Sequence, residues 1–119
     1  MAGSRRKPRV VELFAGAGLL SSAFVSEGFR ISLAIEKNAV AASTYRDNVG
    51  DHILVADVCD VRPEGDCEVI VAGPPCQGFS TLGKRNTDDP RNHLGMQVAV
   101  WAEALSPQVV VIENVPTFL

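Results

Sequence analysis

Short, largely apolar runs alternate along this chain with longer segments in which apolar residues recur at helical spacing. The runs are rich in β-branched residues, as parallel strands are when both faces of their sheet are covered. They occupy residues 10–14, 31–35, 53–56, 69–72 and 109–112. The segments 18–27, 38–48 and 90–105 carry apolar side chains every three or four positions, which predicts helices.

Particular residues mark the ends of the predicted helices. Gly28 suits the end of the first one, because glycine tolerates the left-handed conformation that closes many helices. Asp89 can cap the third helix and Pro90 suits its first turn, whereas Ser106 and Pro107 end it. Alternating strands and helices predict an α/β fold, a doubly wound and mostly parallel sheet whose first strand is central.

The composition is that of one globular domain. The chain has 119 residues, 46% of them hydrophobic, and no apolar run approaches the length of a membrane span. We assign residues 1–9 to a basic N-terminal arm and residues 10–119 to the domain. Because the arm leads into a strand without a cleavable apolar region, we expect a cytoplasmic, nucleoid-associated location. The three cysteines lack Cys-x-x-Cys spacing, so we expect free thiols and no metal site.

A loop with one thiol follows the fourth apolar run directly. Pro74 and Pro75 restrict the backbone before Cys76, and Gly78 lets the chain turn sharply after it. This arrangement is typical of a presented nucleophile. A buried structural cysteine is the alternative, but it does not account for the proline pair.

Glu113 follows the fifth apolar run in the same way. Ligands of open parallel sheets bind beyond the carboxyl ends of the strands, so Glu113 and Cys76 could share one crevice. Without the cysteine loop, a solvated carboxylate at a strand end would be the better interpretation of Glu113.

A glycine-containing turn, Phe14-Ala15-Gly16-Ala17-Gly18, joins the first strand to the first helix. Glycines there permit a tight bend and close approach of a ligand, although they could also serve only to pack helix on strand. Glu36 ends the second strand, where an acidic residue can bind ribose hydroxyls. Together they indicate a nucleoside cofactor, with NAD and S-adenosylmethionine both open from spacing alone.

Several ordered segments resemble motifs of the cytosine-C5 DNA methyltransferase family. They are Glu12-Leu13-Phe14-Ala15-Gly16-Ala17-Gly18-Leu19; Glu36 with Asn38, Tyr45 and Asn48; Asp57-Val58; Pro74-Pro75-Cys76-Gln77-Gly78-Phe79-Ser80; and Glu113-Asn114-Val115. The resemblance runs from about residue 10 to the last residue. It implies a Rossmann-like methyltransferase fold, truncated after the fifth strand, because the family continues with further strands and a target-recognition region.

The resemblance also implies roles for the cofactor residues. It selects S-adenosylmethionine, with Phe14 near the adenosyl group, Glu36 on the ribose and Asp57 on the adenine amino group. The other residues that it assigns to the cofactor site are Ala15, Gly16, Ala17, Gly18, Leu19 and Val58. By itself, Asp57 would be an ordinary turn former at a strand end. Where this chain has Leu19 the family commonly has glycine, so Leu19 would crowd the methionine end of the cofactor.

For catalysis, the resemblance implies that the Cys76 thiolate adds to carbon 6 of a flipped cytosine while Glu113 binds N3. Lys84 and Arg91 are either phosphate contacts or ordinary surface charges, and Trp101 lies on the apolar helix stripe and is expected in the core. The net charge of −3 is unfavourable for DNA binding by this chain alone.

Two alternatives stay open at this stage. One is an RNA cytosine methyltransferase of the same fold, because the base chemistry is identical. The other is a non-catalytic nucleoside-binding or assembly module, favoured by Leu19 and the missing half and opposed by the intact Cys76 and Glu113. We expect the chain to be inactive alone and to need a complementary chain with the missing motifs.

Overall fold

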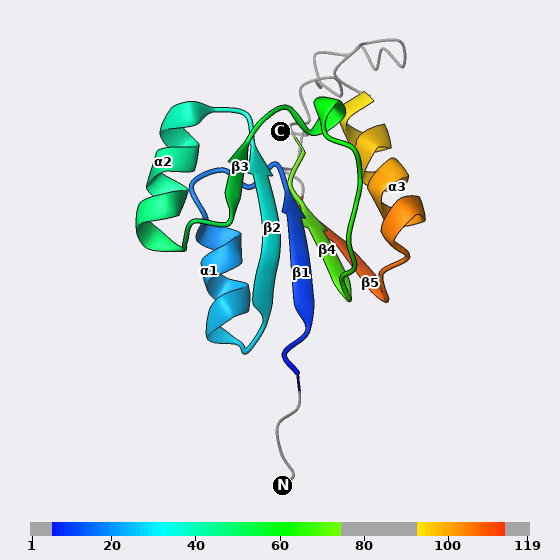
Figure 1. Ribbon diagram of the computed structural model, residues 1–119, viewed down its shortest axis with the longest axis horizontal. Helices are drawn as coiled ribbons and strands as arrows, with labels where there is room; N and C mark the ends of the chain where they lie inside the picture. Colours follow the sequence, from blue (N-terminus) through cyan, green and yellow to red (C-terminus); the bar gives the residue numbers. More distant parts are fainter. Residues whose placement is uncertain (1–5, 75–92, 114–119) are drawn as a thin grey trace, which may run out of the picture.

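The computed structural model describes residues 6–74 and 93–113. Within them, strands alternate with helices (Figure 1). The elements are β1 (Arg9–Leu13), α1 (Leu19–Ser26), β2 (Arg30–Glu36), α2 (Ala39–Asn48), β3 (Ile53–Val55), the 3₁₀ helix η1 (Val58–Asp60), β4 (Val69–Ala72), α3 (His93–Leu105) and β5 (Val109–Ile112). All five predicted strands and three predicted helices are present, and η1 is an addition that the sequence analysis did not predict.

The strands form one parallel sheet in the order β3-β2-β1-β4-β5. The order reverses at β1, so the predicted doubly wound sheet with a central first strand is confirmed. Helices α1 and α2 lie on one face of the sheet and α3 on the other (Figure 1). The carboxyl ends of β1, β2 and β4 therefore meet along one edge.

Alternate side chains of the buried strands supply the cores on the two faces of the sheet. On one face, Val11 and Leu13 of β1 pack with Trp101 of α3, which is fully buried. On the other face, Val10 packs with Tyr45 of α2. The prediction that Trp101 belongs to the core is confirmed.

Local backbone geometry explains where the elements end. Strand β1 ends one residue earlier than predicted, because Phe14 adopts φ 59° and leaves the extended region. Gly28, with φ 94°, follows α1 as expected, and Ser106, with φ 48°, follows α3. The predicted start of the third helix at Asp89 and Pro90 lies outside the described residues.

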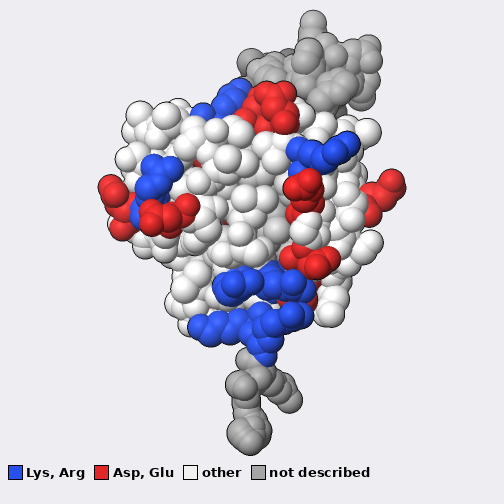
Figure 2. All heavy atoms as spheres, viewed as in Figure 1, with Lys and Arg blue, Asp and Glu red and all other residues white. Residues whose placement is uncertain are grey.

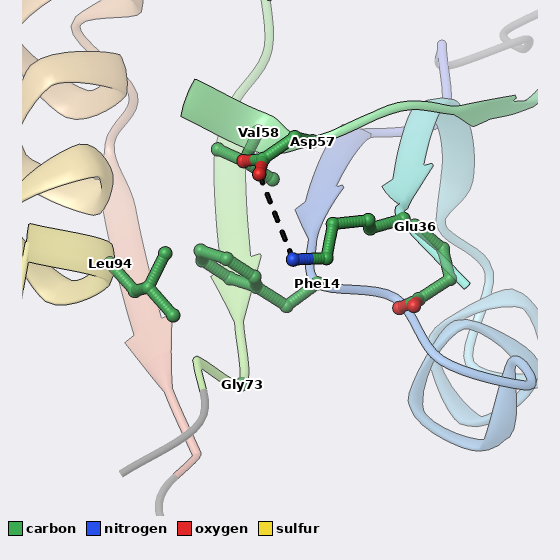
Figure 3. A pocket seen from close by; sticks show the side chains of 7 residues that line it. Phe14, Glu36, Asp57, Val58, Gly73 and Leu94 are labelled. Carbon is green, nitrogen blue, oxygen red and sulfur yellow. Dashed lines mark ion pairs between the residues drawn. The ribbon is translucent and has the colours of Figure 1, made fainter. Parts of the chain in front are cut away.

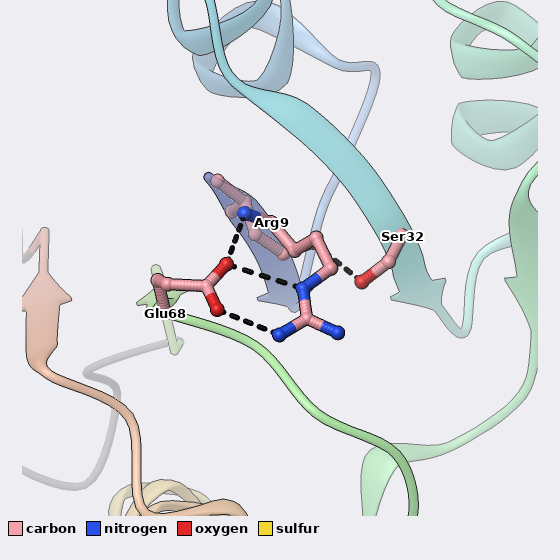
Figure 4. Close-up of polar contacts among 4 residues, drawn as sticks. Arg9, Ser32 and Glu68 are labelled. Carbon is pink, nitrogen blue, oxygen red and sulfur yellow. Dashed lines mark hydrogen bonds and ion pairs between the residues drawn. The ribbon is translucent and has the colours of Figure 1, made fainter. Parts of the chain in front are cut away.

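The amino end of β1 is held by an ion pair, so the strand begins one residue earlier than predicted. The Arg9 backbone N–H donates to Glu68 Oε1 at 2.6 Å, and Arg9 Nη2 lies 2.6 Å from Glu68 Oε2 (Figure 4). The bonds from Arg9 lower the pKa of Glu68 to about 2. The same interactions tie β1 to the segment that enters β4.

Basic side chains gather at this amino end of the sheet, around the start of β1 (Figure 2). Arg9, Arg30 and Arg62 line one surface hollow there, together with Glu64 and Asp66. This surface lies opposite the strand ends where the cofactor residues were predicted. Among the described residues, no helix has both the length and the apolar character needed to cross a membrane.

Candidate active site

The glycine turn at the carboxyl end of β1 has left-handed backbone at three positions. Phe14, Gly16 and Gly18 have φ of 59°, 61° and 100°. A Cβ atom at Gly18 would lie 2.6 Å from Val49 Cγ2, so only glycine fits where α1 packs over α2. Gly18 therefore packs the turn against α2. It lines neither of the two pockets described next.

Glu36 fixes the conformation of this turn. Its Oε1 accepts a hydrogen bond from the Gly16 backbone N–H at 2.7 Å, and its Oε2 accepts one from the Asn38 N–H at 2.8 Å. Asn38 in turn caps α2 by accepting from the N–H groups of Val40 and Ala41. A carboxylate has about four acceptor positions, so both oxygens of Glu36 retain capacity for ligand hydroxyls.

A pocket of about 190 Å³ brings together Phe14, Glu36, Asp57 and Val58, four of the residues predicted to bind the cofactor (Figure 3). Leu94 of α3 closes its other side. The pocket, named here the Glu36–Asp57 pocket, has an apolar wall, two carboxylates and the ammonium group of Lys37. That combination suits a flat, partly apolar ligand that carries hydroxyl or amino groups.

Asp57 has both of the roles considered for it. Its Oδ1 accepts from the Cys59 N–H at 2.8 Å and caps η1, and its Oδ2 lies 3.8 Å from Lys37 Nζ (Figure 3). The Cys59 N–H bond and, to a smaller extent, Lys37 hold the pKa of Asp57 below its usual value. Asp57 is thus a turn former that also lines the pocket as a carboxylate.

A second pocket, of about 490 Å³, lies on the other side of Phe14 and Gly73, which line both. We name it the Glu12–Glu113 pocket. Its walls are Glu12, Phe14, Ala15, Gly16, Ala17, Leu19, Leu20, Ala23, Gly73 and Glu113. Leu19 lines it with 88% of its surface exposed.

The ends of β4 and β5 meet at the Glu12–Glu113 pocket. The Glu113 N–H donates to the Ala72 carbonyl at 2.8 Å, and a Cβ atom on Gly73 would lie 3.2 Å from Glu113 Oε1. Glu113 therefore stands beside the first residue of the cysteine loop. Cys76 itself lies outside the described residues, as do Lys84, Arg91 and Asn114.

Comparison with known proteins decides the family of this chain. Residues 8–119 match the family model described as C-5 cytosine-specific DNA methylase. This chain belongs to that family. It is 38% identical over 114 residues to the type II methyltransferase M.DdeI of Desulfomicrobium norvegicum, covering 89% of this chain and 27% of that protein.

Solved structures agree with this membership of the methylase family. A prophage-encoded protein of E. coli superposes with a TM-score of 0.77 at 31% identity, covering 93% of this chain and 33% of that one. The S. pombe Dnmt2 methyltransferase gives 0.72 at 26% identity, covering 94% and 37%. The chain thus spans about a third or less of the length of M.DdeI and of the E. coli structure. The predicted family and Rossmann-like fold are confirmed.

The sequence analysis did not assign a role to one buried polar group at this site. Glu12, next to the last residue of the central strand β1, is only 3% exposed, and its carboxyl accepts a hydrogen bond from Ser21 Oγ. Burial and the neighbouring charge of Glu36 raise the pKa of Glu12 to about 7, against the opposing effect of Ser21. A carboxylate that interrupts the apolar run 10–14 was the available signal.

Proposed function

We propose that this chain is the part of a DNA cytosine-C5 methyltransferase that binds S-adenosylmethionine and carries the nucleophile. One observation carries the proposal. In a chain of the C-5 cytosine-specific DNA methylase family, four of the predicted cofactor residues line one pocket, and Glu113 lines the pocket that adjoins it across Gly73. Cofactor and base would then meet at the ends of β1, β4 and β5.

The residues of the Glu36–Asp57 pocket fit the adenosine part of the cofactor. Glu36 offers acceptors for ribose hydroxyls, and its bond to the Gly16 N–H holds it in place before any ligand arrives. Asp57 offers an acceptor for an amino group, whereas Phe14 and Val58 offer apolar contact to a flat base. The methionine part would extend into the Glu12–Glu113 pocket, past Leu19.

When bound, S-adenosylmethionine supplies a methyl group on a positively charged sulfur. The proposed task of this chain is to make carbon 5 of cytosine nucleophilic. Glu113 protonates or hydrogen-bonds N3, the Cys76 thiolate adds to carbon 6, and the double bond between carbons 5 and 6 opens so that carbon 5 can attack the methyl group. After the methyl group is in place, carbon 5 loses its proton, the ring double bond reforms and the bond to Cys76 breaks.

Covalent trapping tests the nucleophile. DNA containing 5-fluorocytosine should form a stable adduct with the complete enzyme that contains this chain, because fluorine cannot leave as a proton does. The adduct should disappear in Cys76→Ser and persist in Cys59→Ser, an exposed cysteine beside Asp57. An adduct through Cys59 or Cys67 would refute the assignment.

Calorimetry with the 119-residue chain tests cofactor binding separately from catalysis. Glu36→Gln should weaken S-adenosylmethionine binding, whereas Cys76→Ser should leave it nearly unchanged because the thiol acts on the base. A chain that binds neither S-adenosylmethionine nor its demethylated product would contradict the proposal. RNA in place of DNA in the trapping assay would reveal the alternative substrate.

We also propose that a complementary segment or chain completes the sheet beside β5. Val109 and Ile112 are 51% and 55% exposed, which is unusual for a parallel strand. Among the described residues, β5 is the last strand on its side of the sheet. The target-recognition function, and with it most phosphate contacts, would reside in that complementary part, and the DNA substrate would place the enzyme at the nucleoid.

A further inference from the structure

A chain of four hydrogen-bonded side chains runs from the Glu12–Glu113 pocket toward the surface. Ser21 Oγ donates to Glu12 Oε1, Tyr45 Oη donates to Ser21 Oγ at 2.8 Å, and Tyr45 Oη shares a 2.7 Å hydrogen bond with His52 Nε2. The residues come from β1, α1, α2 and the segment before β3. Glu12, Ser21 and Tyr45 are buried, and His52 is partly exposed.

This polar chain crosses a sheet face that is otherwise apolar. The surrounding core contains Val10, Ala34, Ala42 and Val71. Buried polar groups stabilise a fold only when all of them are satisfied, and apolar residues of similar size commonly do as well or better. Folding alone therefore does not require a carboxyl at position 12. What the carboxyl does contribute is an ionisable group in the wall of the pocket.

Tyr45 also packs against the glycine turn at Gly18. A Cβ atom at Gly18 would lie 3.0 Å from Tyr45 Cδ2, so the tyrosine ring contacts the point where the turn becomes α1. The ring packs edge-on against His52, with ring centres 5.3 Å apart. Tyr45 thus touches the turn, the buried hydrogen-bond chain and the surface histidine.

We propose that Tyr45 is a positioning residue that, through Ser21, fixes the Glu12 carboxyl in the wall of the Glu12–Glu113 pocket and couples its charge to His52. The ionised Glu12 carboxylate would then favour a positively charged ligand in that pocket. This inference rests on the proposed function, in which the ligand carries a positively charged sulfur.

The electrostatic surroundings agree with a group that changes charge near neutral pH. Burial raises the pKa of Glu12 to about 7, and the carboxylate of Glu36 on β2 acts in the same direction. Glu113 lines the same pocket from the end of β5, and Tyr45 reaches the site through Ser21. Burial lowers the pKa of His52, and the charge of Asp51 partly offsets this.

The first test needs no cofactor. In an NMR titration of the 119-residue chain, the His52 ring signals should show a step near pH 7 that follows the ionisation of Glu12, and Glu12→Gln should remove this step. In a Tyr45→Phe background, the step should be less than half as large. An equal response in both backgrounds would overturn the coupling.

Serine variants give a matched pair for the positioning role. Ser21→Ala removes a hydrogen bond to the carboxylate, so the proton affinity of Glu12 should rise about tenfold, seen as a midpoint shift of about one pH unit. Ser22→Ala removes an exposed hydroxyl from the next position of α1 and should shift nothing. Equal titration of Glu12 in both variants would refute the role of Ser21, independently of whether Tyr45→Phe folds.

The second test compares two ligands that differ in charge at sulfur. Affinity for S-adenosylmethionine should rise about tenfold as Glu12 ionises between pH 6 and 8, a gain comparable to one charge-assisted interaction. Affinity for S-adenosylhomocysteine, whose sulfur is neutral, should rise less. Tyr45→Phe should displace the pH profile, whereas Thr44→Val, on the exposed side of α2, should not.

The outcomes separate the two proposals. If the chain binds neither ligand, the proposed function fails, while the NMR titration still decides the coupling. If it binds both with the same pH profile, the cofactor function stands and the proposed cation selectivity of Glu12 is wrong.

Discussion

Replacing Glu12 with glutamine should remove a pH dependence of stability that the wild-type chain carries at neutral pH. In the folded protein the pKa of Glu12 is raised from 4.5 to about 7, chiefly by burial. The folded state therefore holds the proton more tightly than the unfolded state does. This contribution to stability is fully present below pH 4.5 and is lost as the pH rises through 7.

The size of the effect follows from the two pKa values. Their difference corresponds to about 3 kcal/mol over the full range, of which about 2–3 kcal/mol falls between pH 5 and pH 8. Other groups act in the opposite direction. The pKa of His52 is lowered and that of Glu68 is about 2, so the stability that each group contributes to the fold is lost as the pH falls. Their contributions are common to wild type and variant and largely cancel in the comparison.

Urea unfolding followed by Trp101 fluorescence would measure this difference. Trp101 is the only tryptophan and is fully buried, so its emission reports the loss of the core. The stability of Glu12→Gln minus that of wild type should grow by about 2–3 kcal/mol from pH 5 to pH 8. Glu103→Gln, an exposed control on α3, should track the wild type. A constant difference across this range would show that Glu12 titrates normally and would refute the reasoning.

Three further predictions concern the turn, the cofactor and the sheet edge. Gly18→Ala should destabilise the chain by about 3 kcal/mol, since it combines left-handed strain with a clash against Val49, whereas Gly16→Ala, with open space at its Cβ, should cost about 1–2 kcal/mol in urea melts. Glu36→Gln should weaken S-adenosylmethionine binding by about 1.5–3 kcal/mol in calorimetry, and unchanged affinity would limit Glu36 to holding the turn. The isolated chain should self-associate through β5, and Val110→Lys should reduce this in light scattering; a wild-type monomer would contradict it.

The sequence predicted the strands and the central place of the first one because buried parallel strands carry a recognisable pattern. The runs are largely apolar, and the connecting segments are long enough for crossover helices. The finer boundaries followed from backbone geometry that the pattern does not contain. Phe14 reads as one more apolar strand residue, but its positive φ begins the turn, and η1 follows from one side-chain bond of Asp57.

The candidate site was predictable where a residue type stands at a strand end. Phe14, Glu36, Asp57 and Val58 are brought to one pocket because the carboxyl ends of β1, β2 and β3 share an edge of the sheet. Glu113 was predictable for the same reason. Cys76, whose role rests on resemblance, remains a prediction because it lies outside the described residues.

The buried chain from Glu12 to His52 was not predictable because its members lie far apart in sequence. Ser21 is an ordinary position of an amphipathic helix, Tyr45 belongs to a motif that assigns it no role, and His52 stands alone between predicted elements. Only the packing of α1 and α2 side by side on β1 and β2 brings their polar atoms into line. Such a network depends on β1, α1, α2 and the segment before β3 coming together, whereas a sequence pattern describes one element at a time.

The strand order itself links these parts into one site. Because β1 is central, its single carboxyl faces the helices that supply Ser21 and Tyr45, while its carboxyl end opens between Glu36 on one side and Gly73 on the other. An ionisable group in the buried central strand costs stability at neutral pH, and the fold nevertheless retains it, hydrogen-bonded to Ser21 and, through Ser21, to Tyr45. The ionised Glu12 carboxylate lies in the wall of the pocket next to Glu113, where a bound cation would stabilise it and offset this cost. The same residue therefore connects the stability of the sheet to the occupancy of the pocket, so ligand binding should stabilise the chain more at pH 8 than at pH 6.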